Sequence, residues 1–154
     1  VNYFDFGEFV LADLPGYGFA KVSKSEKERW AKTLDSFFKN KQTIAHVFML
    51  ADSRHDPTAD DVQMIKFLNH HIIPFTVVLT KADKLSRMKL KENVKAIAAD
   101  LYMGVENLLP TSAETGLGKE AVLGKIAEVI AAAEASAAED ESEEDGEEAE
   151  LVRE

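Results

Sequence analysis

The chain has 154 residues, a formal net charge of −10, 45% hydrophobic residues and no cysteine. This length allows one domain with a buried core. The lack of cysteine excludes disulfides and thiolate metal sites and suits the reducing cytoplasm, where we expect the protein to reside. Because no run of 18 apolar residues occurs, neither a membrane-spanning helix nor a membrane partner is expected.

Hydrophobic patterning predicts a hairpin followed by alternating helices and strands. Residues 1–6 and 8–13 are predicted to form two strands joined near Gly7, where glycine can adopt a positive φ. Periodicity predicts strands over residues 44–52, 73–83 and 107–113, and helices over residues 23–40, 56–71, 86–103 and 118–135. This alternation predicts an α/β fold with a mostly parallel sheet and helices on both faces.

The acidity is concentrated at the end of the chain. Residues 139–154 contain ten acidic residues and one arginine, so this segment carries −9 and the rest of the chain carries −1. Such a block repels itself, which predicts a disordered tail over residues 134–154 after a domain over residues 1–133. The tail could serve solubility alone or contact a basic partner. The near-neutral remainder lacks the basic footprint of a dedicated nucleic-acid-binding domain.

Three polar clusters lie at the ends of predicted strands: "DLPG" at Asp13–Gly16, "TKAD" at Thr80–Asp83 and "TSA" at Thr111–Ala113. Because the carboxyl ends of parallel strands meet at one edge of a sheet, we expect the clusters to form a single site. Alone, each has a simpler interpretation: a Pro-Gly turn, a helix entry capped by Asp83, and a short loop. Their order, spacing and strand-end positions together have the layout of a Ras-like GTPase.

The residue types in these clusters suit a guanine nucleotide. Asp13 can hold Mg²⁺ directly or through water, and Gly16 allows its backbone N–H to approach a phosphate. The Asp83 carboxylate has two acceptors that match N1–H and the N2 amino group of guanine, whereas adenine would leave a charge unpaired. Lys81 can lay its aliphatic stem along the purine. The small residues of Thr111–Ala113 let backbone N–H groups come near guanine O6.

The residues around the three clusters narrow the resemblance from Ras-like GTPases in general to one family. The segments "DLPGYGFAKVSK", "LADSRHDPTADDVQMIKFL", "PFTVVLTKADKLSR" and "TSAETGLG", with Trp30, resemble the bacterial EngB (YihA or YsxC) family of ribosome-biogenesis GTPases, over roughly residues 1–130. The resemblance implies a three-layer Ras-like P-loop GTPase fold and a monomer that binds and hydrolyses GTP with Mg²⁺. It also implies a role in large-subunit assembly, with a possible link to cell division. It assigns Mg²⁺ to Asp13 and nucleotide contacts to Asp13, Leu14, Pro15, Gly16, Thr80, Lys81, Ala82, Asp83, Thr111, Ser112 and Ala113.

One family motif does not occur in these 154 residues, namely GxxxxGK[ST]. Because "VNYF" resembles the strand after the family's switch loop, we expect the chain to begin inside the domain, without its first strand, P-loop and first helix. The P-loop supplies most of the phosphate cradle in this class, so nucleotide affinity should be nearly lost. The strands that end at Asp13 and Asp52 should then pair directly, or the chain should fold poorly.

Three remaining features have open interpretations. Tyr17 stands where Ras-type enzymes have a water-orienting Gln, so no catalytic residue is assigned; with Phe19 it could instead pack on a partner. Asp52 and Arg54 are expected to pair and tie down their loop. A basic stretch is either a solvated helix start or a contact for ribosomal RNA; its residues are Lys21, Lys24, Lys27 and Arg29.

Two alternative functions remain open at this point. The chain could be a non-enzymatic, GTPase-like interaction module that binds a ribosomal or division partner without nucleotide. It could also be another Ras-like bacterial GTPase, of the Era or EngA type.

Overall fold

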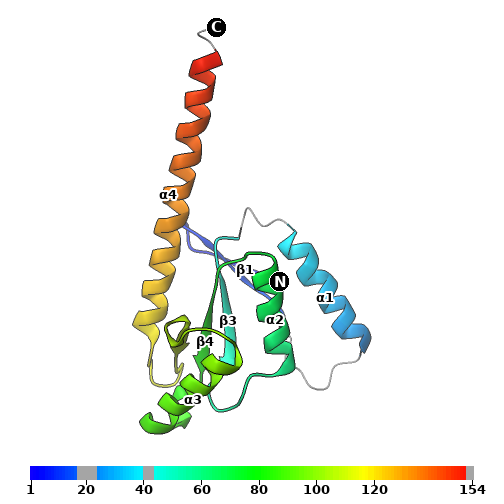
Figure 1. Cartoon of the computed structure of the whole chain (residues 1–154), viewed down its shortest axis with the longest axis vertical. Helices are drawn as coiled ribbons and strands as arrows, with labels where there is room; N and C mark the ends of the chain where they lie inside the picture. The colour runs from blue at the N-terminus through cyan, green and yellow to red at the C-terminus, as the bar shows by residue number, and fades with distance from the viewer. Residues whose placement is uncertain (17–23, 40–43, 152–154) are drawn as a thin grey trace.

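The structure is a computed structural model that describes residues 1–16, 24–39 and 44–151. These residues form a two-stranded hairpin, a three-stranded sheet and four long helices (Figure 1). Among the described helices, none combines the length and the apolar character needed to cross a bilayer.

The hairpin forms as predicted. Strand β1 (Asn2–Asp5) pairs antiparallel with β2 (Val10–Asp13), with Asn2 opposite Asp13. Gly7 in the turn has φ 85°, a conformation that strains residues with a side chain, and its N–H donates to Asp5 Oδ1 at 2.8 Å. The turn predicted at Gly7 is therefore confirmed.

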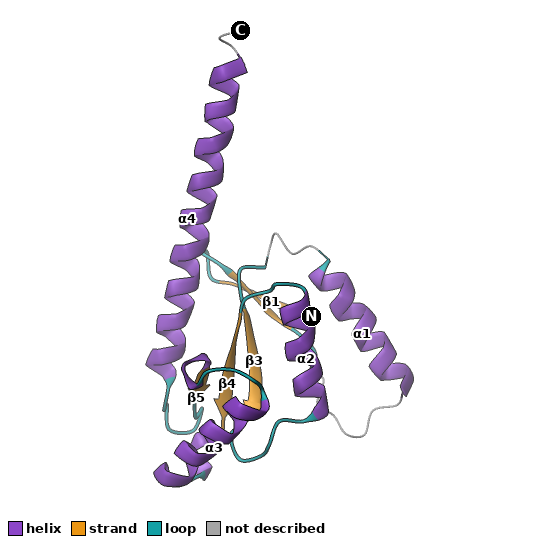
Figure 2. Ribbon diagram, in the orientation of Figure 1, coloured by secondary structure: helices purple, strands orange, loops and turns teal. Residues whose placement is uncertain are grey.

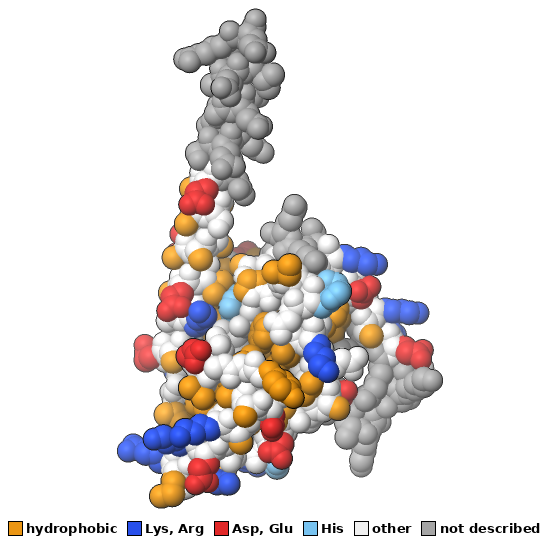
Figure 3. Space-filling view, viewed as in Figure 1, with side chains coloured by type: hydrophobic (Ala, Val, Ile, Leu, Met, Phe, Trp, Pro, Cys, Tyr) orange, Lys and Arg blue, Asp and Glu red, His pale blue; other side chains and the backbone are white. Residues whose placement is uncertain are grey.

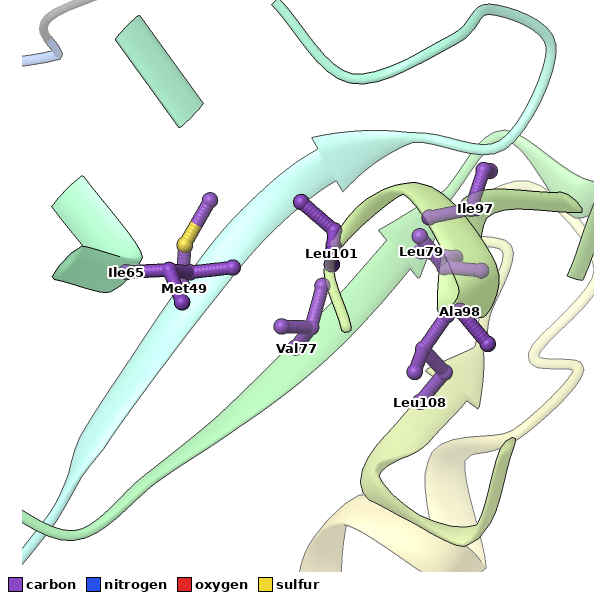
Figure 4. Close-up of a cluster of buried hydrophobic side chains, with 8 residues drawn as sticks. All are labelled: Met49, Ile65, Val77, Leu79, Ile97, Ala98, Leu101 and Leu108. Atoms are coloured by element: carbon purple, nitrogen blue, oxygen red, sulfur yellow. The ribbon is translucent and has the colours of Figure 1, made fainter. Parts of the chain in front are cut away.

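The central sheet is parallel, in the order β3 (Val47–Asp52), β4 (Phe75–Thr80) and β5 (Leu108–Pro110). Helices α2 (Ala59–His70) and α3 (Arg87–Asp100) contribute to the hydrophobic core on one face of this sheet. Full burial of a large aliphatic side chain stabilises a fold by roughly 1.5–3 kcal/mol, so this cluster is a main source of stability. Its members are Met49, Ile65, Val77, Leu79, Ile97, Ala98, Leu101 and Leu108 (Figure 4).

Helix α4 (Lys119–Leu151) begins against the other face of the sheet. Side chains alternate along a strand, so Thr76 of β4 points away from the core residue Val77. Thr76 lines a pocket of about 340 Å³ together with Ala121 and Lys125 of α4. Helices therefore lie on both faces of a parallel sheet, and the predicted α/β fold is confirmed (Figure 2).

A second hydrophobic cluster joins α1 (Lys24–Phe38) to α2. Leu34 and Phe38 of α1 are buried with Leu68 and Ile73. Leu34 and Phe38 thus form a buried apolar face of the helix that was predicted over residues 23–40, while the side chain of Trp30 lies outside the described part.

The hairpin and the parallel sheet do not join. The described strands form two separate sheets, β1–β2 and β3–β4–β5, so β2 and β3 do not pair with each other. Of the two outcomes expected for the strands ending at Asp13 and Asp52, direct pairing does not occur, and poor folding of the chain stays a prediction. Helix packing through the second cluster connects the two parts instead, because Leu14, directly after β2, packs against it.

Helix α4 is longer than predicted. The periodicity predicts that this helix ends at residue 135, whereas in the structure the helix continues to Leu151 and projects away from the sheet (Figure 1). Alanine and glutamate dominate residues 131–150, and their high helix propensity gives no local stop signal before Gly146. Disorder of residues 134–154 stays a prediction based on their charge.

Candidate functional site

The loop after β4 holds Thr80–Asp83 in an unusual backbone conformation. Lys81 has φ 60° and ψ 30°, a left-handed conformation that is uncommon for a residue with a side chain. The Thr80 hydroxyl donates to Ala51 O at 3.1 Å, which fixes the start of this loop to β3. The next residues form a single 3₁₀ turn, η2 (Ala82–Lys84), in which Ala82 is buried. The chain therefore turns sharply and places Asp83 at the edge of the sheet.

The loop after β5 lies directly against the loop after β4. The Ala82 N–H donates to Thr111 O at 2.9 Å, and the Thr111 N–H donates to Leu79 O at 2.7 Å. Ser112 is buried, and its Oγ accepts a hydrogen bond from the Thr115 N–H at 3.1 Å. Two of the three predicted clusters, Thr80–Asp83 and Thr111–Ala113, are thus brought together.

Gly118 sets the course of the chain after the second loop. Its φ is +76°, and a Cβ at this position would lie 2.1 Å from Pro110 O. Only glycine fits this close approach without a shift of the backbone. Pro110 directly precedes Thr111–Ala113, so the shape of that loop depends on this glycine.

The carboxylate of Asp83 is oriented by two neighbours. A hydrogen bond from the Ser112 side chain lowers the pKa of Asp83, and the ammonium of Lys84 contributes to the same effect. Lys84 Nζ lies 2.9 Å from Asp83 Oδ2, and the Asp83 side chain is 13% exposed. Asp83 is therefore held as an anion at an accessible edge of the sheet, where it can accept hydrogen bonds.

An ion-pair cluster at the end of β3 completes this edge. Arg54 donates from Nε to Asp52 Oδ1 at 2.9 Å and from Nη2 to Oδ2 at 2.8 Å, so the pairing expected for these two residues is confirmed. Lys81 Nζ also lies 3.0 Å from Asp52 Oδ2. The contact between Asp52 and Lys81 did not follow from the sequence pattern. Its only signal was that Asp52, like the three predicted clusters, ends a strand.

The third cluster, Asp13–Gly16, lies elsewhere. Leu14 packs against the hydrophobic cluster of Leu34, Phe38, Leu68 and Ile73, against which Val47 and Phe75 also pack. Val47 and Phe75 are the first residues of β3 and β4, whereas Lys81 follows the last residue of β4. A six-residue strand spans roughly 20 Å, so Leu14 lies toward the opposite end of the sheet from Lys81. The physical reason is the lack of pairing between β2 and β3.

Asp13 alone does not make a magnesium site. Mg²⁺ prefers six oxygen ligands, and Asp13 supplies one exposed carboxylate. Within residues 1–16, 24–39 and 44–151, no three His, Asp or Glu side chains gather in a way that could hold a metal ion. The described residues therefore do not fit Mg²⁺ without oxygen ligands from a bound nucleotide.

Several predicted residues cannot be placed. Tyr17, Phe19 and Lys21 lie outside the described residues, as do the side chains of Lys24 and Lys27; Arg29 is exposed on α1. On the face shown in Figure 3, Lys and Arg side chains are interspersed with acidic and apolar ones. Of the four residues in the predicted basic stretch, only Arg29 has a described side chain, so the RNA contact stays a prediction.

The Asp52 cluster predicts a specific pH dependence of stability. The Arg54 hydrogen bond holds the pKa of Asp52 well below its usual range. A carboxyl group with a lowered folded-state pKa adds stability that is complete above the unfolded-state pKa of about 4 and is lost as the pH falls further. We expect Asp52→Asn to be less stable than the original chain at pH 6. This difference should narrow below about pH 4 in urea-denaturation experiments. A difference independent of pH between 6 and 3 would contradict the expectation.

Several known proteins that share one name are similar to this chain in sequence. No known protein-family model matches the chain. A protein of Anoxybacillus flavithermus named "Probable GTP-binding protein EngB" is 42% identical over 119 residues, which cover 77% of this chain and 62% of the relative. Proteins of the same name from Geobacillus thermodenitrificans and Bacillus cereus are 42% and 39% identical and are covered over 58% and 62% of their lengths. The chain thus spans about three-fifths of these curated relatives.

A solved structure supports the fold independently. It is described as "Crystal structure of a probable GTP-binding protein engB" and matches with a TM-score of 0.72 and 23% sequence identity. The match covers 84% of this chain and 81% of that chain. At this identity the likeness concerns the α/β Ras-like fold and nothing beyond it.

Proposed function

Since the chain belongs to the EngB family, we propose that it provides the guanine-recognition part of a GTP-binding protein. The observation that carries this proposal is the joining of Thr80–Asp83 to Thr111–Ala113. The Ala82 N–H bonds to Thr111 O at 2.9 Å, and Ser112 orients the Asp83 carboxylate. Guanine would bind at the edge of the sheet where these two loops meet.

Base selection would follow from the charge of Asp83. An ionised carboxylate accepts hydrogen bonds from N1–H and from the N2 amino group of guanine. Adenine has an acceptor at N1 and would leave the carboxylate unpaired, at a cost of about 1–3 kcal/mol. Lys84 Nζ contacts one oxygen of Asp83, so guanine must displace this ammonium. Because Lys84 is half-exposed, we expect displacement to cost little.

The described residues would bind the phosphates of the nucleotide less tightly than its base. Gly16 and Asp13 are the predicted phosphate and Mg²⁺ contacts, and neither is joined to the base site in this structure. In P-loop GTPases, phosphate binding relies mostly on the P-loop backbone and its lysine. Mg²⁺ bound with the nucleotide phosphates would neutralise charge on them. Asp13 is the protein ligand that the family resemblance implies, but in this structure the Asp13–Gly16 segment lies toward the opposite end of the sheet from the base site.

Nucleotide titration tests whether the two loops bind the base while a P-loop provides most of the affinity for the phosphates. For a polypeptide of residues 1–154, isothermal titration with GDP and Mg²⁺ should give a dissociation constant well above the micromolar range. A form extended upstream through a GxxxxGK[ST] motif should bind far more tightly. Micromolar binding by residues 1–154 alone would contradict the view that the P-loop dominates affinity. If both forms failed to bind, the chain would instead be an interaction module.

The cellular role follows the family resemblance. We propose that the GTPase acts in the cytoplasm as a monomer during large-ribosomal-subunit assembly, with the basic stretch around Arg29 as a contact for ribosomal RNA. A salt-dependent loss of RNA binding on Arg29→Ala, measured by filter binding with ribosomal RNA, would support that contact. Unchanged binding across salt concentrations would contradict it.

A further inference from the structure

Beyond the residues of the base site, we propose that Asp52 is a positioning residue that holds Lys81 ready to lie along the purine. Asp52 ends β3 and Lys81 directly follows β4, the neighbouring parallel strand in the sheet. Their charged groups meet at 3.0 Å, between Asp52 Oδ2 and Lys81 Nζ. This inference rests on the proposed function, because it assigns a role at the site where guanine would bind.

Arg54 fixes the Asp52 carboxylate. The Arg54 backbone N–H donates to Asp52 Oδ1 at 3.0 Å, and Nε and Nη2 of the guanidinium donate to Oδ1 and Oδ2 at 2.9 and 2.8 Å. This two-pronged arrangement sets the plane of the carboxylate as well as its position. The Asp52 side chain is only 23% exposed, so water competes weakly for its oxygens.

Lys81 is consequently held at both ends. Its backbone is fixed in the left-handed conformation, where the Lys84 N–H donates to Lys81 O at 3.0 Å. Its ammonium is bound to Asp52, which leaves the four methylene groups between two fixed points. An unanchored lysine loses up to about 2 kcal/mol of rotamer entropy when it is ordered. Holding Lys81 before the base arrives removes much of that cost from binding.

A purely structural role explains this pair less well. The side chain of Lys81 is 55% exposed, and ion pairs with an exposed member contribute about 0–1 kcal/mol to stability. Arg54 already satisfies both oxygens of Asp52, so that carboxylate does not need Lys81 as a partner. The ion pair instead orients the side chain of Lys81, and this orientation matters only when a purine base is bound.

A double-mutant cycle with GMP as the probe tests the proposal. The variants are Asp52→Asn, Lys81→Met and the double variant, and GMP affinity is measured by NMR titration of backbone amides. We expect each single change to weaken GMP binding by about threefold to tenfold, because the pair acts as one unit. Adding Asp52→Asn to Lys81→Met should then have no further effect. If Asp52 only supported the fold, it would weaken binding equally with or without Lys81, and that result would overturn the proposal.

Two controls separate the possible failures. Asp35→Asn removes the exposed ion pair between Asp35 of α1 and Lys39, directly after this helix, and should leave GMP affinity unchanged. Should Asp52→Asn fail to fold, as judged by urea denaturation, Lys81→Met and Arg54→Lys provide the cycle instead. If the original chain binds GMP no better than AMP, the proposed function fails. If it prefers GMP but Asp52→Asn leaves the affinity intact, the proposed function stands and this inference fails.

Discussion

Asp83→Asn should change the base preference of the site from guanine to xanthine. An asparagine side chain offers one acceptor and one donor, so it can pair with the N1–H of a purine and with the O2 of xanthine. Guanine would instead present its N2 amino group to the amide donor. We expect GMP affinity to fall by at least about tenfold, since a buried mismatch costs about 1–3 kcal/mol, while XMP affinity rises. NMR titrations of both nucleotides against both chains measure the change.

The control for this substitution is Asp100→Asn, which removes an exposed aspartate at the end of α3. It should leave the ratio of GMP to XMP affinity unaltered. Because Ser112 and Lys84 interact with the Asp83 carboxylate, Asp83→Asn also needs a stability measurement. An unchanged preference in a folded Asp83→Asn chain would show that Asp83 does not read the base.

Gly118→Ala should destabilise the chain by at least about 2 kcal/mol. A Cβ at residue 118 would lie 2.1 Å from Pro110 O, and the φ of +76° is itself unfavourable for alanine. Relief requires a backbone shift in β5 or in the loop that carries Ser112. We therefore expect a lower free energy of unfolding in urea denaturation and altered amide shifts at Thr111–Ala113.

Gly116 provides a matched comparison. It has φ +77°, yet a Cβ there would meet no atom within 4 Å. Gly116→Ala carries only the conformational cost, about 1 kcal/mol. If the two substitutions destabilise the chain equally, the close approach to Pro110 is not what requires glycine at residue 118.

The elements that the sequence predicted correctly are those with a strong local signal. The turn at Gly7 depends on a residue that tolerates φ 85°, and the apolar residues of β3 and β4 mark buried strands on their own. Leu34 and Phe38 follow helical spacing and are buried together. Local chemistry decides these features, so no tertiary information was needed.

Features that depend on distant contacts were harder to predict. Alanine and glutamate dominate the last part of α4. Both favour a helix, but neither determines the residue at which the helix ends. The position of Asp13–Gly16 depends on which strand pairs with β2. The sequence of the Asp13–Gly16 motif does not specify that partner strand. Proximity of the strand ends was predicted, and it holds for Thr80–Asp83 and Thr111–Ala113, which parallel pairing of β4 and β5 brings together.

Asp52 shows a different limit of sequence reasoning. Its pairing with Arg54, two residues away, could be anticipated from the residues themselves. Its contact with Lys81, 29 residues away, arises because β3 and β4 are neighbours in parallel register, with Asp52 opposite Thr80. Strand order was therefore required to find the residue that holds Lys81.

The most direct test of guanine recognition is a pair of NMR titrations of the chain, one with GMP and one with AMP. GMP should shift the backbone amides of Thr80–Asp83 and Thr111–Ala113 at lower concentrations than AMP does. Amides at the far pocket, around Thr76 and Lys125, should not respond. Equal responses to the two nucleotides, or shifts confined to residues away from these two loops, would contradict the account.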